Sequence, residues 1–132
     1  METLGVHRAI NSIYGDWSIN GVEYSLYLED IKHLLTSSKL KTLSIDTVMW
    51  KGYNFGKNQI NEKCICCGGV RFIRADISFP PIVVSGLQNR DNKLYRLIDG
   101  KHRVMKMIDN GLSENTFYVL DFSEVESHLR PL

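Results

Sequence analysis

The sequence has no run of apolar residues that could cross a bilayer, and no cysteine framework of the kind that holds small secreted domains together. A membrane-spanning helix needs about 20 apolar residues in succession, and no stretch of the 132 residues approaches that length. The N-terminal METLGVHRAI also lacks the apolar core of a signal peptide. The three cysteines, Cys64, Cys66 and Cys67, are odd in number and crowded, which suits a reducing compartment. We therefore expect a soluble cytoplasmic protein.

A large excess of charge of either sign is absent as well. The chain has 16 Lys and Arg residues and 15 Asp and Glu residues, so its formal net charge is +1 and it exerts no strong overall field on nucleic acid or on a membrane surface. Basic residues gather only between Arg90 and Lys106, where six Lys or Arg residues accompany two Asp residues. With 43% hydrophobic residues, residues 1–132 have the size and composition of one globular domain.

The order of apolar and polar residues predicts an α/β (α+β) domain, in which a small mixed sheet is flanked by helices. Alternation with a period of two, or short β-branched and aromatic runs, predicts strands at 21–28, 43–49, 79–85, 94–98 and 116–120. Polar residues 88–93 predict a turn that joins two of these strands in a hairpin. Helical spacing predicts a short helix after Glu29 and Asp30, and a last helix that Ser123 caps.

The stretch from Tyr95 to Ile108 is the most informative part of the chain. It predicts a strand that turns through Asp99 and Gly100 directly into an amphipathic helix. The helix is expected to end at Asn110 and Gly111, which are well suited to a left-handed C-terminal cap.

The start of this helix is a candidate phosphate site. The first amides of a helix have no carbonyl partners within it and carry the positive end of the macrodipole, so they favour an anion. Lys101, His102 and Arg103 lie on the first turn and strengthen that attraction. We therefore expect a domain that binds a phosphate ligand or a nucleotide.

Residues 51–69 are expected to form an irregular loop, since glycines and asparagines interrupt them and apolar residues occur singly. A loop of this length inside a compact domain is uncommon unless it is functional or disordered, so it is a second candidate region. An insertion without chemistry is the alternative. Its cysteines, Cys64, Cys66 and Cys67, are not accompanied by the second pair of cysteines that a typical zinc site has. We favour reduced cysteines and predict no metal site there.

The segment of residues 79–121, about a third of the chain, resembles the core of the ParB/sulfiredoxin superfamily. The matching residues are Pro81 to Val84, Tyr95 to Arg103, Gly111 and the strand around Val119. The resemblance implies a small α/β fold in which a Gly-x-(His/Arg)-Arg turn cradles the phosphates of a nucleotide. ATP or CTP with Mg²⁺ is the expected ligand.

The resemblance also implies roles for the residues of the turn. Gly100 would allow close approach of the backbone to the ligand, and Lys101 and Arg103 would counter phosphate charge. His102 would donate a hydrogen bond or move a proton. Asp99 resembles the Asp-Gly-His form of kinase-like members.

The sequence departs from the family pattern in two ways, and each makes one of the family's known activities unexpected for this chain. Lys101 stands where sulfiredoxins have their catalytic cysteine, so sulfinate reduction by that chemistry is not expected. Only about twenty residues follow Gly111, so the DNA-binding and dimerisation parts of a ParB clamp do not fit. A stand-alone core with a diverged N-terminal part suits a protein of a phage or mobile element.

Several alternatives stay open at this point. Asp99 either orients a nucleophile or helps to hold Mg²⁺, or it is a turn residue that caps the helix. His102 is either a phosphate ligand or acid/base group, or a surface residue, and Arg103 suits bidentate phosphate binding. The leading function is the binding of a nucleotide or another phosphorylated ligand at Gly100 to Arg103, and NTPase or phosphotransferase activity is the chemistry that such binding could serve. The alternatives are a non-catalytic module that binds nucleic acid or a partner protein through residues 90–106, and a ParB-like nuclease.

Overall fold

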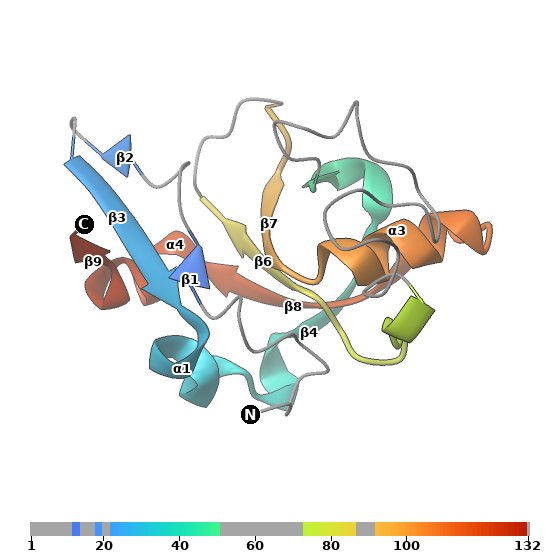
Figure 1. Cartoon of the computed structure of the whole chain (residues 1–132), viewed down its shortest axis with the longest axis horizontal. Coiled ribbons are helices and arrows are strands. Elements are labelled where there is room, and N and C mark those ends of the chain that lie inside the picture. The colour runs from blue at the N-terminus through green and yellow to red at the C-terminus, as the bar shows by residue number, and fades with distance from the viewer. Residues whose placement is uncertain (1–11, 14–17, 20–21, 51–72, 87–91, 132) are drawn as a thin grey trace.

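The computed structural model describes residues 12–13, 18–19, 22–50, 73–86 and 92–131. Its centre is a curled five-stranded mixed sheet with the strand order β4-β8-β6-β7-β5 (Figure 1). These strands are β4 (Leu40–Ser44), β5 (Val48–Met49), β6 (Ile82–Ser85), β7 (Tyr95–Asp99) and β8 (Glu114–Asp121). A mixed α+β architecture with a small sheet is therefore confirmed.

The strand directions agree with the expected hairpin. β6 and β7 pair in antiparallel fashion, with an irregularity between Ile82 and Val83, and β8 runs parallel to β6 on its other side. β5 runs parallel to β7, and β4 runs antiparallel to β8. The predicted strand at 79–85 begins only at Ile82, because Pro80 and Pro81 have no amide hydrogen to donate to a neighbouring strand.

The short strand or extended segment predicted at 43–49 is confirmed only in part. A strand runs from Leu40 to Ser44, a single 3-10 turn, η4 (Ile45–Thr47), follows, and a second short strand begins at Val48. Ile45 and Val48 are both buried. Two residues that are three positions apart point to opposite faces of a strand, but to the same side of a 3-10 turn. The turn therefore interrupts what the sequence suggested was one strand.

A second, smaller set of strands surrounds β3 (Val22–Tyr27), which confirms the strand predicted at 21–28. Its partners all pair with it in antiparallel fashion, and they are β1 (Ser12–Ile13), β2 (Ser18–Ile19) and β9 (Arg130–Pro131). The end of the described chain thus returns to lie against its first long strand (Figure 1).

Short helices connect the strands and one longer helix packs on the sheet. The helix predicted after Glu29 is two short pieces, α1 (Leu28–Ile31) and η2 (Lys32–Leu34), and η3 (Ser37–Lys39) leads into β4. The helix predicted at Gly100 is α3 (Lys101–Asp109). It ends as predicted, because Gly111 N donates to Ile108 O and Leu112 N donates to Met107 O, the two bonds of a Schellman cap.

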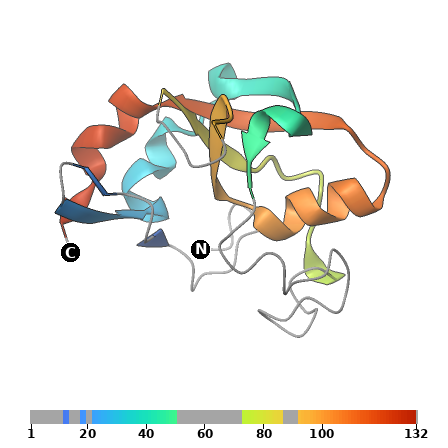
Figure 2. The ribbon, with the colours of Figure 1, turned by 90° about the horizontal axis from the view of Figure 1, so that it is seen from above.

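The sheet is buried on both faces, which explains why β6 is a continuous apolar run. Ile82 and Val84 contribute to a cluster with residues of β3, α1 and the C-terminal segment, whereas Val83, between them, packs into a cluster with Val104 and Met107 of α3. α3 and the α1 and α4 helices accordingly lie at opposite sides of the sheet (Figures 1 and 2).

The last helix is α4 (Phe122–Val125), continued by η6 (Glu126–His128). Ser123 does not cap it as predicted. The cap is Asp121, whose carboxylate accepts a hydrogen bond from Ser123 N, while the Glu124 side chain accepts one from Asp121 N. This reciprocal arrangement is a capping box, which can use Asp at the cap as well as Ser or Thr.

We expect Asp121→Ala to lower the free energy of unfolding by about 1–2 kcal/mol, because it removes the cap acceptor. Urea unfolding followed by circular dichroism measures the change. Ser127→Ala on the exposed part of η6 is the matched control and should leave the midpoint almost unchanged. Equal midpoints for the two variants would contradict the role of the cap.

Candidate functional site at the start of α3

The predicted strand-turn-helix junction is present. β7 ends at Asp99, Gly100 is the N-cap residue with φ 105° and ψ 25°, and α3 begins at Lys101. Val104 N donates to Gly100 O over 3.0 Å, which is the first bond of the helix. The amides of Lys101, His102 and Arg103 come before this bond and lie outside the helix's own hydrogen-bond pattern. The N-cap residue Gly100 has no side chain that could accept from them.

Gly100 is required by packing as well as by its backbone angles. A Cβ atom at this position would lie 2.7 Å from Pro81 Cβ and 3.0 Å from the Nη2 atom of Arg103. The close approach that glycine permits is therefore to the protein's own Pro81, the residue before β6. This differs from the predicted role, in which Gly100 makes room for a ligand.

Asp99 and Arg103 form a buried ion pair beneath the turn. Arg103 Nη2 donates to Asp99 Oδ2 over 2.7 Å, and the two side chains are only 5% and 3% exposed. Arg103 Nη1 also donates to the carbonyl oxygens of Phe79 and Pro80, each over 3.2 Å. Arg103 therefore points into the protein, so the prediction that it faces a phosphate does not describe this arrangement. Asp99 does not cap the helix either, because its carboxylate faces Arg103.

The pair has an unusual proton affinity. Burial raises the pKa of the Asp99 carboxyl to about 6, although the charge and the hydrogen bond of Arg103 act in the opposite direction. Burial also lowers the pKa of Arg103, with Asp99 opposing that shift. At neutral pH the carboxylate is ionised and neutralises the guanidinium.

Lys101 and His102 are the half-buried side chains of the first turn of α3. Together with the backbone amides, they are the groups that this junction can offer to a ligand at the surface. Of the five consecutive predicted site residues, Asp99 and Arg103 are thus buried, whereas Gly100, Lys101 and His102 are half-buried.

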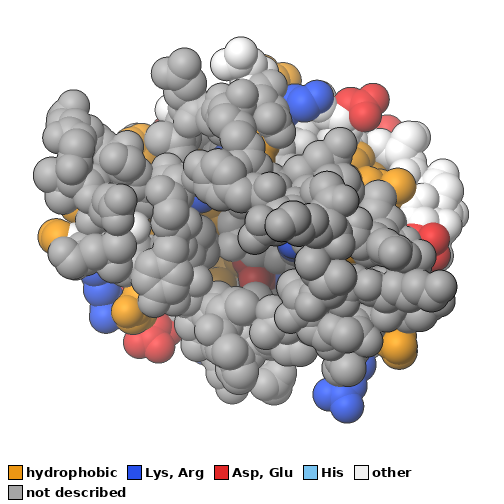
Figure 3. Space-filling model, turned by 45° about the horizontal axis from the view of Figure 1, so that its top comes forward, with side chains coloured by type: hydrophobic (Ala, Val, Ile, Leu, Met, Phe, Trp, Pro, Cys, Tyr) orange, Lys and Arg blue, Asp and Glu red, His pale blue; other side chains and the backbone are white. Residues whose placement is uncertain are grey.

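The basic segment of residues 90–106 does not form a continuous basic surface in the part that the structure describes. Arg96 and Arg103 are buried, at 4% and 3% exposure. Lys106 Nζ donates to Ile73 O and Ala75 O, over 3.0 and 2.9 Å. Figure 3 shows Lys and Arg side chains at several places on one face of the molecule. Arg90 lies outside the described residues.

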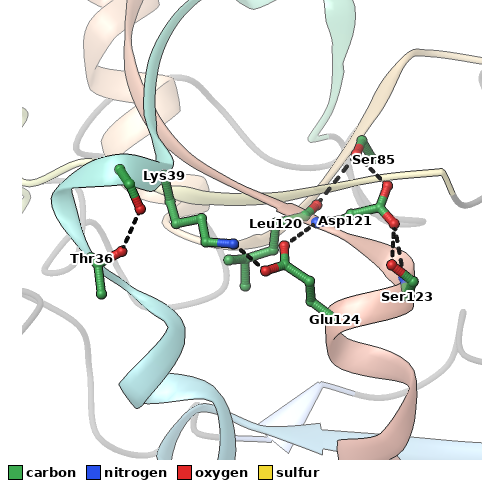
Figure 4. Close-up of polar contacts among 8 residues, drawn as sticks. Thr36, Lys39, Ser85, Leu120, Asp121, Ser123 and Glu124 are labelled. Atoms are coloured by element: carbon green, nitrogen blue, oxygen red, sulfur yellow. Dashed lines mark hydrogen bonds and ion pairs between the residues drawn. The ribbon is translucent and has the colours of Figure 1, made fainter.

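A polar cluster at the other end of β6 and β8 was not predicted (Figure 4). Ser85 Oγ donates to Asp121 Oδ1 over 3.3 Å, and Lys39 forms an ion pair with Glu124. Hydrogen bonds from Ser123 lower the pKa of Asp121. The spacing of Asp121 and Glu124 is the signal of a capping box that could have revealed the cluster. Its hydrogen bonds hold α4 and η3 together, and it serves the fold.

The loop predicted at 51–69 and its cysteines, Cys64, Cys66 and Cys67, lie outside the described residues. Within the described ranges, no three His, Cys, Asp or Glu side chains gather closely enough to hold a metal ion. Those ranges also contain no helix with the length and hydrophobicity needed to span a membrane.

Comparisons with protein-family models, with curated proteins and with solved structures found no match for this chain. The resemblance to the ParB/sulfiredoxin superfamily, with its nucleotide and Mg²⁺, stays a prediction. The site is therefore interpreted from its own geometry.

Two glycine substitutions separate the demands of backbone and packing. Gly111 also has a positive φ, of 82°, but nothing lies within 4 Å of the Cβ position. We expect Gly111→Ala to cost about 1–2 kcal/mol for its left-handed backbone, and Gly100→Ala to cost about 2 kcal/mol more, because Pro81 must move. Urea unfolding measures both, and equal losses would show that the contact with Pro81 yields easily.

The raised pKa of Asp99 predicts a stability that falls with rising pH. The pKa in the unfolded chain is near the ordinary value of 3.8, against about 6 in the folded protein. Between pH 4 and pH 6 the Asp99 carboxyl holds a proton in the folded protein but not in the unfolded chain. The stabilisation from this proton is therefore complete below about pH 4 and is lost as the pH rises through about 6. The free energy of unfolding should decline by up to about 3 kcal/mol over that interval because of this group.

The Asp99 carboxyl carbon reports this titration directly in an NMR pH series. A midpoint near 6 is expected, and Asp99→Asn should remove both this signal and the corresponding slope in urea unfolding. A midpoint near or below 4 would mean that the charge of Arg103 outweighs burial.

Proposed function

We propose that this chain binds a nucleotide or another phosphate-bearing ligand at the N-terminus of α3, as a domain of the ParB/sulfiredoxin type. The observation that carries the proposal is the left-handed Gly100 followed directly by a nine-residue helix at the end of a sheet strand. This is the local geometry in which backbone amides can converge on an anion.

The physical basis is the direction of consecutive amides. A residue in the left-handed region next to one in the right-handed helical region turns successive N–H groups toward one point, which forms an anion-binding concavity. At the start of α3, the helix macrodipole adds about half a positive charge to the same place. An anion at that point would meet the amides around Gly100 and Lys101.

In this proposal some side chains of the turn contact the ligand and others hold the turn in position. Lys101 supplies a positive charge on the first turn, and His102 a second polar group. Arg103 is neutralised by Asp99 and joins the turn to the carbonyl oxygens of Phe79 and Pro80. In this proposal Arg103 is a positioning residue that fixes the angle of the helix start, and it does not contact the phosphate.

The position of Asp99 supports ligand binding better than it supports catalysis. A carboxylate that activates a nucleophile must reach it, whereas the Asp99 side chain is 5% exposed and its Oδ2 atom accepts from Arg103. The proposal therefore requires no catalytic role of Asp99 or His102, and the NTPase and phosphotransferase activities stay predictions. Burial of Arg96 and Arg103 weakens the alternative of a nucleic-acid surface on residues 90–106.

Calorimetric titration of the full chain with ATP, CTP and inorganic triphosphate, each with Mg²⁺, tests the proposal. We expect saturable binding by at least one of them and a loss of about five- to tenfold in affinity for Lys101→Ala, as the removal of one charge-assisted contact implies. Lys101 is suited to this test because no described side-chain bond of the fold depends on it.

Lys41→Ala is the matched control, because Lys41 is exposed on β4 and the same charge is removed away from α3. Its affinity should equal that of the unmodified chain. Absence of binding by all three ligands would overturn the proposal, and an equal loss in both variants would reduce it to non-specific charge attraction.

A further inference from the structure

Two histidines that are distant in sequence meet on the side of the molecule opposite to α3. His33 on η2 and His128 on η6 have ring centroids 5.3 Å apart and ring planes at 72°. His33 is exposed and His128 is half-buried, so both rings can be reached from solvent. Neither residue belongs to the phosphate site.

The chain segments that carry the two histidines are fixed to each other nearby. Arg130 donates two hydrogen bonds to Asp30, each over 2.8 Å, and its guanidinium lies 4.3 Å from the centre of the Tyr27 ring. Arg130 also belongs to β9, which pairs with β3. The backbones that carry the two histidines are therefore joined by these contacts.

We propose that His33 and His128 form a two-histidine site for a borderline transition-metal cation such as Zn²⁺, with water in the remaining positions. Imidazole nitrogens are the protein ligands that zinc and its neighbours accept most readily.

The separation of the rings fits this assignment. With Zn–N bonds of about 2.0–2.1 Å, each ring centroid lies about 3.2 Å from the ion, and two ligands at a tetrahedral angle then have centroids about 5.2 Å apart. The observed 5.3 Å matches that value. Rotation about χ2, which is a broad torsion for histidine, changes the direction of the ring nitrogens at little cost.

The charges around the pair also favour a cation. Glu29, Lys32 and Glu126 lie on the chain segments that carry the two histidines. Asp30 and Arg130 lie there too, but they form an ion pair and neutralise each other. The local surplus is thus acidic.

The test uses the full chain in a Cys64→Ser, Cys66→Ser, Cys67→Ser background, so that thiolates do not compete for the metal. Zn²⁺ is titrated while NMR follows the imidazole signals of all four histidines. We expect the His33 and His128 signals to shift together with one midpoint, and His7 and His102 to serve as internal references. A rise in Tm of at least about 3 °C at saturation is expected.

Substitutions then separate chelation from single-histidine binding. His33→Ala should weaken Zn²⁺ binding at His128 at least tenfold, whereas Lys32→Ala, the exposed neighbour on η2, should not weaken it. His128→Gln keeps the half-buried volume and should weaken binding at His33 to the same degree. Separate midpoints for the two rings, no shift in either, or an unchanged response of one ring after loss of the other would each overturn the site.

Discussion

The buried ion pair between Asp99 and Arg103 determines how the proposed site is built. The pair joins the last residue of β7 to the first turn of α3, and Arg103 extends the connection to the carbonyl oxygens before β6. Removing one partner would leave the other charge without compensation in a poorly solvated place, which is among the costlier changes a core can suffer. Strand, turn and helix are therefore fixed relative to one another at the place where a ligand is expected.

Because of this ion pair, neighbouring basic residues of the segment have different roles, although the sequence suggests the same role for all of them. Lys101 and Arg103 are only two positions apart, yet one is half-buried at the helix start and the other is buried among protein acceptors. Lys106, one turn later, holds the carbonyl oxygens of Ile73 and Ala75. Much of the positive charge in this segment organises the protein's own backbone, and only part of it can act on a partner.

The sequence predicted the elements whose signals are local. The hairpin of β6 and β7, the start of α3 and its Schellman cap followed from proline positions, from Gly100 and from Gly111. The direction of Arg103 did not, because a list of cations does not say which side chain meets a buried acid. Asp99 and Arg103 have opposite charges and stand on the two sides of the turn at Gly100, and this was the missed clue. The interruption at Ile45 depended on a core that only tertiary packing reveals.

β4 ends the row of five strands, with β8 as its neighbour among the described strands. Its exposed residues include Lys41, Thr42 and Ser44, and a lysine on such a border disfavours the annealing of a foreign strand, since pairing would desolvate its charge. Among the described residues, this lysine is a chemical protection of the outer strand of the sheet. A single charged side chain at such a position can therefore oppose the growth of intermolecular sheets.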